Sequence, residues 1–232
     1  RTPLSTVTLA LESLDRLDLP ENARKRLGLA RQEAGRMAGL LEEILLYAKP
    51  LKLDLRRLSA ANLLRRFLDD YRALAQTRDQ RLRLQGGSAD AEFMGDEHRL
   101  TQMLANLTQN ACEAAPEGTE IVWTLRDEPD RGAVVLEVSN GGPAIPPDLL
   151  PRLTEPFVST KPSGTGLGLA IVQRLTRAHG GELSIVSDEE EGTRVSLVFP
   201  RLYTAATDPG NAVEAGRRAD TPATGAGRAA SA

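Results

Sequence analysis

Apolar residues recur at helical spacing through the first fifty residues of the chain. Leu4, Val7, Leu11 and Leu14 lie three or four positions apart and predict a first helix that ends near the turn signal at 18–20. A longer run predicts a second helix that continues to Pro50, with apolar positions at Leu27, Ala30, Ala34, Met37, Leu41, Ile44 and Ala48. Since two antiparallel helices leave an apolar stripe uncovered, the pattern favours a dimeric four-helix bundle. A hairpin that packs against the rest of its own chain is the alternative.

After residue 50 the pattern changes to short alternating segments between amphipathic helices. The Gly- and Pro-rich stretch at 140–168 is long for a connection inside a domain, and such loops usually carry function. The remaining pattern predicts extended segments at 51–55, 81–85, 91–94, 120–126, 133–138, 182–187 and 193–199, and helices capped by Ser59, capped by Asp96 and at 165–179. Sequential strands with helices on one face predict an α+β sandwich.

Composition narrows the class of protein. The 232 residues are 41% hydrophobic and carry a net charge of −3, with one Trp, three Tyr and four Phe, so nucleic acid is not an expected partner. Cys112 is the only cysteine and is predicted to fill the core. With no apolar run of about 20 residues and no signal segment, we expect a cytoplasmic segment that makes no membrane contact.

The last residues differ from the rest of the chain. Residues 204–232 consist mainly of Ala, Gly, Thr, Arg and Asp, which cannot offset the entropy of ordering. We therefore predict a helical hairpin at 1–50, an α+β domain at 51–203 and a disordered tail at 204–232.

Three motifs occur in an order that suggests one nucleotide pocket: NLTQNACEAA at 106–115, SNGGPAIP at 139–146 and EPFVSTKPSGTGLGLAI at 155–171. In the third, Gly164, Gly166 and Gly168 lead directly into an apolar helix. Glycine lets backbone N–H groups approach a phosphate, and a helix N-terminus attracts negative charge. Glycine clusters also simply make turns, but the three motifs together favour an ATP site.

Residues 96–200 closely resemble the ATP-binding domain of bacterial sensor histidine kinases, in the gyrase, Hsp90, histidine kinase and MutL superfamily. The N box is NLTQNA, the F box EPFVSTK and the second glycine box GTGLGLAIV, with HGG at 179–181 and Gly-Thr at 192–193 as further matches. The initial RTPL resembles the end of the family motif H-E-L-R-T-P-L, and the two helices resemble its dimerisation and histidine-phosphotransfer hairpin.

The resemblance implies a Bergerat-type ATP-binding domain and a homodimeric protein histidine kinase of a two-component phosphorelay. Its phosphoacceptor histidine would lie three residues before Arg1. The γ-phosphoryl of ATP would pass to that histidine and then to an aspartate of a response regulator, with the ATP domain swinging on a linker at 49–53. His98 and His179 are expected to be structural.

The resemblance also assigns the site. Asn110 would hold Mg²⁺, Asn106 and Lys161 would act at the phosphates, and Thr2 would orient water in a response-regulator phosphatase reaction. An Asn at 106, where hydrolytic relatives carry a Glu, suits transfer to histidine rather than to water. The full set of ATP-binding residues would be Asn106, Asn110, Asn140, Gly142, Ile145, Lys161, Gly164, Thr165, Gly166, Leu167, Gly168 and Thr193.

Three positions depart from the family pattern. Asn140 replaces the Asp that accepts the adenine amino proton, which weakens that contact by about 1 kcal/mol. Ala144 replaces a Gly and restricts the backbone if that position needs a positive φ. Glu113 replaces a basic residue, which leaves Lys161 as the candidate for neutralising the γ-phosphate and an ordinary solvated lysine as the alternative. Phe157 is expected to anchor the lid by packing on the core.

Two other functions remain open from the sequence. The departures at Glu113, Asn140 and Ala144 suit a degenerate core that binds nucleotide or a regulator and signals without kinase activity. A serine kinase or clamp ATPase of the same superfamily is disfavoured by the N-terminal hairpin and by Asn106.

Overall fold

The computed structural model describes residues 2–15, 17, 19–76, 79–87, 91–159, 161 and 164–202. The chain divides into two units, 1–201 and 202–232, and everything below concerns the first. The predicted disorder of 204–232 and the side chain of Thr2 lie outside what the structure describes.

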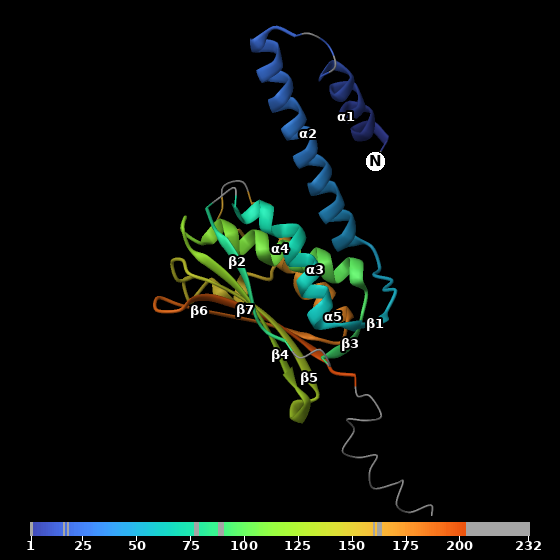
Figure 1. Cartoon of the computed structure of the whole chain (residues 1–232). Helices are drawn as coiled ribbons and strands as arrows, with labels where there is room; N and C mark the ends of the chain where they lie inside the picture. Colours follow the sequence, from blue (N-terminus) through green and yellow to red (C-terminus); the bar gives the residue numbers. More distant parts are fainter. Residues whose placement is uncertain are drawn as a thin grey trace, which may run out of the picture. The chain divides into compact units, whose positions relative to one another are not determined.

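The N-terminal region is a pair of helices, α1 (Thr2–Asp15) and α2 (Glu21–Ala48), which lie side by side (Figure 1). An ion pair between Asp15 and Arg31 joins them. Leu27 and Ala34 are the buried residues of α2, whereas Met37 and Ile44 on the same predicted stripe are 50% and 45% exposed. The two helices are therefore as predicted, and much of their apolar stripe is uncovered within one chain.

A five-stranded sheet forms the body of the second region (Figure 1). Its strands, in spatial order, are β2 (Arg81–Gly86), β4 (Glu120–Glu128), β5 (Ala133–Asn140), β7 (Gly192–Pro200) and β6 (Glu182–Asp188). β2 is parallel to β4, and the other neighbouring strands are antiparallel. A separate pair of strands is formed by β1 (Arg56–Ser59) and β3 (Glu92–Gly95).

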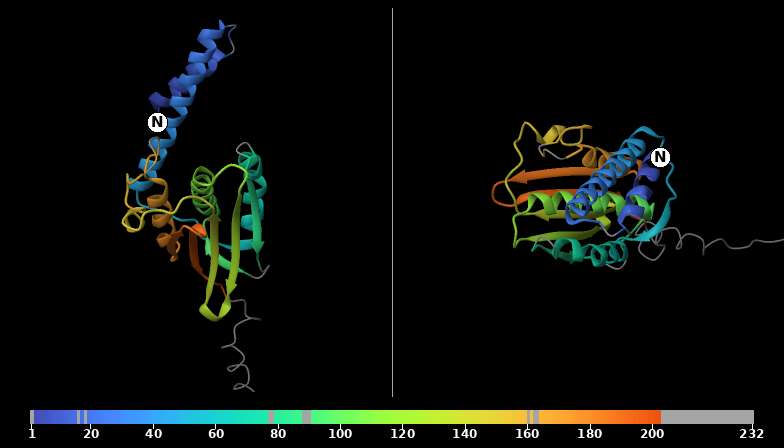
Figure 2. Two further views of the ribbon diagram at one scale, coloured as in Figure 1. Left: turned by 90° about the vertical axis from the view of Figure 1, so that its left-hand side faces the viewer. Right: turned by 90° about the horizontal axis from the view of Figure 1, so that it is seen from above.

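Three helices, α3 (Ala60–Gln76), α4 (Glu97–Ala114) and α5 (Gly168–Ala178), pack on one face of the sheet (Figure 2). Alternation in β5 sends Val134, Leu136 and Val138 into this helical layer. The predicted α+β sandwich is confirmed.

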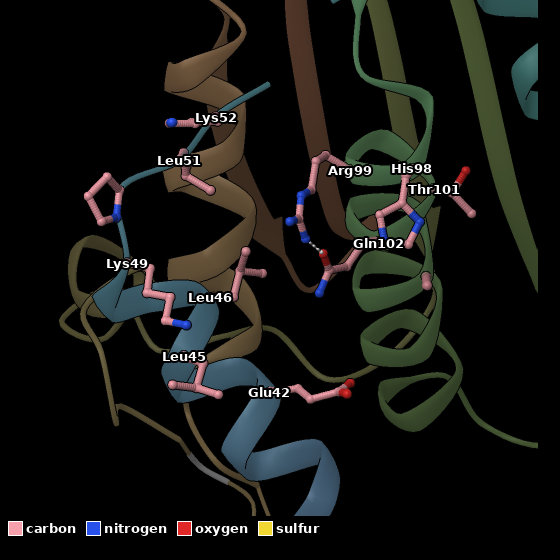
Figure 3. A pocket seen from close by; sticks show the side chains of 12 residues that line it. Glu42, Leu45, Leu46, Lys49, Leu51, Lys52, His98, Arg99, Thr101 and Gln102 are labelled. Atoms are coloured by element: carbon pink, nitrogen blue, oxygen red, sulfur yellow. Dashed lines mark hydrogen bonds between the residues drawn. The ribbon is translucent and has the colours of Figure 1, made fainter. Parts of the chain in front are cut away.

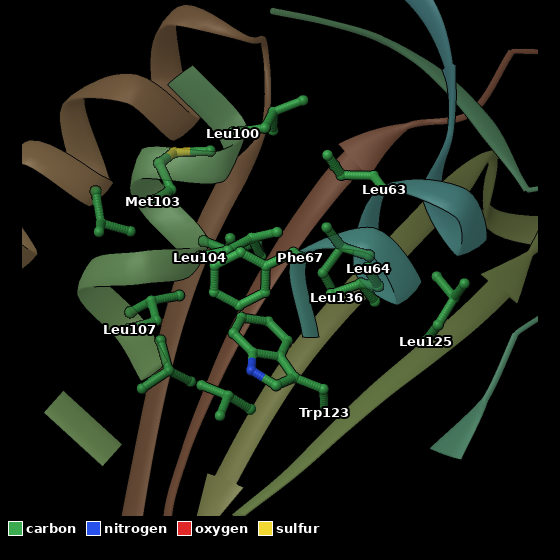
Figure 4. Packing of buried hydrophobic residues seen from close by; sticks show 14 of the residues in the cluster. Leu63, Leu64, Phe67, Leu100, Met103, Leu104, Leu107, Trp123, Leu125 and Leu136 are labelled. Carbon is green, nitrogen blue, oxygen red and sulfur yellow. The ribbon is translucent and has the colours of Figure 1, made fainter. Parts of the chain in front are cut away.

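The core lies between the sheet and the three helices, around Trp123 of β4 (Figure 4). Trp123 is fully buried and meets the ring of Phe67 edge-on at a centroid distance of 6.4 Å. Cys112 is 3% exposed within the same cluster, as the sequence predicted. The apolar side chains of α4 that Figure 4 labels are Leu100, Met103, Leu104 and Leu107.

The predicted helix caps are present. Asp96 accepts a hydrogen bond from the Arg99 N–H at 3.1 Å, and the Ser59 hydroxyl accepts one from the Asn62 N–H at 3.4 Å. The extended segment predicted at 51–55 belongs to no sheet, and the first strand is β1, for which β3 offers pairing partners from Arg56 onward. None of the described helices combines the length and apolar character needed to cross a bilayer.

Candidate nucleotide site

The three motifs surround one cavity of about 650 Å³ at the ends of α4, β5 and β7 and the start of α5. Ligand pockets commonly measure about 300–1,000 Å³. Ten of the predicted binding residues line it: Asn106, Asn110, Asn140, Ile145, Lys161, Gly164, Thr165, Gly166, Gly168 and Thr193. The other two, Gly142 and Leu167, are not among its lining residues.

At one end of the cavity, two asparagines of α4 face the first residue of α5. The Asn106 amide donates a hydrogen bond to the Gly168 carbonyl at 3.4 Å. A Cβ placed on Gly168 would lie 3.9 Å from the amide nitrogen of Asn106 and 4.0 Å from that of Asn110. Because the first N–H groups of a helix have no partner within the helix, this end suits an anion flanked by both amides.

The donor set around Asn110 fits a magnesium ion that is held mainly by other ligands. The described residues hold no group of three or more His, Cys, Asp or Glu side chains able to bind a metal. Mg²⁺ usually takes one or two protein oxygens and fills the remaining positions with phosphate oxygens and water. The amide oxygen of Asn110 is suited to be one of these protein ligands.

Gly166 shapes the base of the glycine loop. It has a φ of +67°, and a Cβ there would lie 2.5 Å from the Phe157 carbonyl carbon. The Phe157 N–H donates to the Gly166 carbonyl at 3.0 Å, so the two chain segments are in direct backbone contact. This conformation also explains why α5 begins at Gly168 and not at Thr165 as predicted, since a positive φ cannot continue a right-handed helix.

Phe157 does not anchor the loop in the core, and that prediction is wrong for this structure. Its side chain is 71% exposed, and its own φ is +66°. Leu167, which is 1% exposed, occupies the core below the loop instead, and its N–H donates to the Thr165 hydroxyl at 3.1 Å. Leu167 therefore supports the loop from beneath.

Asn140 and Thr193 also line the cavity, and they are register partners on β5 and β7. Thr193 is also paired in register with Ser187 of β6, and their hydroxyl oxygens are 2.8 Å apart. The Ser187 hydroxyl also accepts a hydrogen bond from the Ile145 N–H at 3.0 Å. Ser187 was not predicted as a site residue. Its position opposite Thr193 in the hairpin of β6 and β7 could have identified it as a neighbour of the site.

The loop that follows Asn140 makes a close backbone contact with α4. A Cβ on Gly142 would lie 2.7 Å from the Ala114 carbonyl oxygen, so Gly142 permits this approach without itself lining the cavity. Ala144 has no positive φ, because the non-glycine residues with positive φ in the described part of the chain are Asp79 and Phe157. The condition under which Ala144 would strain the backbone is not met.

Lys161 lies at the cavity in an ion pair with Glu113 of α4. The Gln109 amide donates to the same carboxylate at 2.5 Å. Lys161, which the sequence assigned to the γ-phosphate, therefore lines the expected cavity. Its charge is paired with that of Glu113, at a position where many family members carry a basic residue.

Helix α2 also reaches the glycine loop, which the sequence did not indicate. The Thr165 hydroxyl donates to the Glu43 carboxylate at 2.8 Å, and Glu43 lines the cavity. Arg174 of α5 donates to carbonyls at the end of α2, those of Leu46 at 2.5 Å, Tyr47, and Lys49 at 2.6 Å. A guanidinium at this position satisfies carbonyls that have no partner within the helix.

A second cavity, of about 560 Å³, lies between the end of α2 and α4 (Figure 3). Leu45, Leu46 and Leu51 supply apolar surface, and Lys49, Lys52 and Arg99 supply positive charge. The Arg99 guanidinium donates to the Gln102 amide oxygen at 3.2 Å. This cavity adjoins the linker on which the ATP domain was expected to swing.

The two histidines occupy different environments. His179 is 7% exposed, its Nε2 accepts a hydrogen bond from the Asp96 N–H at 3.0 Å, and its Nδ1 lies 2.7 Å from the Leu175 carbonyl. This ring joins α5 to the start of α4, which is a structural role. His98 is exposed in the first turn of α4 and lines the second cavity.

Two family descriptions match the chain. Residues 1–51 match the His Kinase A (phospho-acceptor) domain, and residues 95–203 match the histidine kinase-, DNA gyrase B- and HSP90-like ATPase. Among curated relatives, the sensor protein kinase PilS of Pseudomonas aeruginosa is 32% identical over 209 residues, covering 87% of this chain and 39% of that protein. The sensor histidine kinase ZraS of Escherichia coli is 31% identical over 201 residues, covering 86% of this chain and 43% of that protein. The chain thus spans less than half the length of these relatives.

Solved structures of histidine kinases are similar as well. Full-length ShkA in complex with AMPPNP superposes with a TM-score of 0.79 at 28% identity, covering 88% of this chain and 44% of that one. ThkA in complex with the response regulator protein TrrA superposes with a TM-score of 0.67 at 26% identity, covering 87% of this chain and 57% of that one. Together with the two domain matches, these similarities show that the chain belongs to the sensor histidine kinases and comprises the catalytic core of that family.

Proposed function

We propose that this chain binds Mg·ATP and transfers its γ-phosphoryl group to a histidine upstream of residue 1, from which it passes to an aspartate of a response regulator. The observation that carries the proposal is the meeting of Asn106 and Asn110 with Gly168, at the start of α5, in one cavity. Phosphoryl transfer depends chiefly on positioning and charge stabilisation, and this arrangement supplies both.

Each end of the cavity has a separate task. The N-terminus of α5 and the glycine loop would receive the phosphates, and Asn110 would hold Mg²⁺, which neutralises phosphate charge when bound. Asn106 has no basic group with which to deprotonate water, so the site favours transfer to an imidazole over hydrolysis. At the other end, Asn140 and Thr193 would accept and donate hydrogen bonds at the adenine.

Two protein partners are part of the proposal: a second copy of the chain and the receiver domain of a response regulator. The exposed side chains of Met37 and Ile44 on α2 would pack against a second copy to form a four-helix bundle. A receiver domain is the second expected partner, and ThkA, a similar kinase, has been solved with its response regulator protein TrrA. The phosphatase role of Thr2 and the division into 1–50, 51–203 and 204–232 remain part of this proposal.

A phosphorylation assay tests the proposal. The chain, extended by the residues that precede Arg1, is incubated with Mg²⁺ and γ-labelled ATP, and the phosphoprotein is treated with acid and with alkali. We expect a label that is lost in acid and retained in alkali, as for phosphohistidine, and that is absent in the N110A variant. Steady ATP hydrolysis without phosphoprotein would instead support a clamp-type ATPase.

One alternative is supported by particular residues. Asn140 replaces a charged adenine contact, and Glu113 engages the lysine at the phosphate end. These features suit a degenerate core that binds nucleotide and signals by conformation alone. The same assay separates the two functions, because a degenerate core would bind nucleotide and yield no phosphoprotein.

A further inference from the structure

Glu113 lies on the face of α4 that lines the nucleotide cavity. It follows Asn110 by three residues and Asn106 by seven, which places the three side chains along one side of the helix. Its carboxylate is held from two directions, by the Gln109 amide on the same helix and by Lys161 from the segment before the glycine run. The carboxylate is therefore held at the wall of the cavity, one turn of α4 beyond Asn110.

The charges that line the cavity make the ion pair between Lys161 and Glu113 important for nucleotide binding. Among the described lining residues, Lys161 is the one cation, and Glu43 and Glu113 are the two anions. A nucleotide with several negative charges would thus enter a cavity whose lining already carries excess negative charge. Its phosphates would meet a lysine that is already paired with a carboxylate.

The ion pair is suited to exchange. The side chains of Lys161 and Glu113 are 36% and 29% exposed, and ion pairs with this access to water are weak because solvent screens them. A phosphate carries more charge than a carboxylate and offers more acceptor oxygens, so it competes well for the same ammonium group. The ammonium group of Lys161 is therefore able to exchange the Glu113 carboxylate for a phosphate at little cost in free energy.

We propose that Glu113 is a specificity-determining residue that competes with the terminal phosphate for Lys161 and so limits the preference of the site for ATP over ADP. The inference rests on the proposed function, in which Lys161 neutralises the γ-phosphate. In the absence of nucleotide, Glu113 holds the ammonium group of Lys161 beside α4. When ATP binds, Lys161 leaves Glu113 for the γ-phosphate, whereas ADP has no group at that position and leaves the pair intact.

Binding measurements on purified chain test the inference without reference to kinase activity. Dissociation constants for Mg·ATP and Mg·ADP are measured by displacement of a fluorescent nucleotide analogue from the unchanged chain, E113Q, K161A and the double variant. We expect E113Q to tighten ATP binding about fivefold, within the usual range for coupled groups, and to change ADP binding much less. E117Q is the matched control, because Glu117 is exposed, lies just beyond α4 and does not line the cavity.

The dependence on Lys161 separates competition from simple repulsion. If Glu113 acts by engaging Lys161, E113Q tightens ATP binding less in the K161A background than in the unchanged chain. An equal or larger effect in the K161A background would overturn the proposal in favour of direct repulsion between carboxylate and phosphate. Circular dichroism and Trp123 fluorescence establish that each variant is folded.

Failure of the inference is distinguishable from failure of the proposed function. If the unchanged chain binds ATP and E113Q behaves like E117Q, the role of Glu113 is overturned and the nucleotide site stands. If the unchanged chain binds neither nucleotide, the proposed function and the inference are overturned together.

Discussion

The indole N–H of Trp123 donates a hydrogen bond to the hydroxyl of Thr108 at 3.1 Å, with both side chains fully buried. Thr108 lies on α4 between Asn106 and Asn110, and Trp123 lies at the centre of β4. The helix that carries the two asparagines is thus tied to the sheet by a buried polar contact, which sets its rotation more narrowly than apolar packing does.

The substitution T108V is expected to destabilise the fold by about 1–3 kcal/mol, because it leaves the buried indole N–H without a partner. Urea unfolding followed by fluorescence measures this directly, since Trp123 is the only tryptophan of the chain. T101V is the matched control: Thr101 bonds only to the Glu97 carbonyl of its own helix, so a change within about 0.5 kcal/mol is expected. Equal losses in the two variants would show that the contact to Trp123 contributes nothing.

The substitution N140D is expected to change nucleotide affinity and stability in opposite directions. Asn140 is 6% exposed, so a carboxylate there is costly in the empty protein and lowers the free energy of unfolding by about 1 kcal/mol or more. A charged acceptor strengthens the predicted adenine contact, and we expect ATP to bind roughly three- to tenfold more tightly. Calorimetric titration and urea unfolding of the same samples check both effects. Weaker ATP binding by N140D would remove Asn140 from the adenine contacts.

The substitution G166A is expected to weaken ATP binding about fivefold or more. A methyl group there would collide with the Phe157 backbone, and the φ of +67° disfavours any side chain, which together cost about 1–3 kcal/mol. G141A is the control, because nothing lies within 4 Å of its added methyl group. Displacement of a fluorescent nucleotide measures both variants, and similar affinities would show that the loop geometry seen here is not the one that binds nucleotide.

Stability is expected to fall in acid through Glu137. Burial opposes the charge of this carboxylate, but hydrogen bonds from Arg126 and Ser196 outweigh burial and hold its pKa below the ordinary value of 4.5. A group whose pKa is lowered by folding stabilises the fold above its unfolded pKa, and that contribution disappears as the pH falls through the folded pKa. The free energy of unfolding of the unchanged chain should therefore decline more than that of E137Q between about pH 7 and pH 3. Parallel curves would contradict the assignment.

The substitution R174A is expected to expose the end of α2. Arg174 supplies hydrogen bonds to the carbonyls of Leu46 and Lys49, which would otherwise lack protein donors. Cleavage after Lys52 by a lysine-specific protease should accelerate by roughly threefold or more, as local opening becomes easier. R177A is the control. It removes an exposed arginine from the last turn of α5, the helix that also carries Arg174, and should leave the cleavage rate unchanged.

Features set by neighbouring residues were predictable from the sequence. The spacing of apolar residues marked the helices and most strands, and Asp96 marked the start of α4 through its local hydrogen bond to Arg99. The asparagines of α4 were identified because NLTQNA resembles the family's N box, and their spacing of one helical turn placed both on one face of the helix. In these cases the interacting groups lie within a few positions of each other.

Contacts between distant segments were not predictable in the same way. Glu43 meets Thr165 across more than a hundred residues, and no local pattern marks that pairing. Phe157, in the segment that resembles the F box, was expected to pack on the core. It instead has a left-handed backbone conformation next to Gly166, and Leu167 is the buried residue. The position of β2 beside β4, parallel and at the sheet edge, also depends on packing that spacing does not encode.

The pairing of Asn140 with Thr193 has a consequence for protein engineering. Their positions are set by the main-chain ladder between β5 and β7 and by Gly192, whose φ of +77° brings the chain against the Asn140 carbonyl. Neither side chain is needed to build that ladder. Under the proposed function, in which these two side chains contact the adenine, the choice of purine is open to redesign by exchanging donor and acceptor groups without changing the backbone.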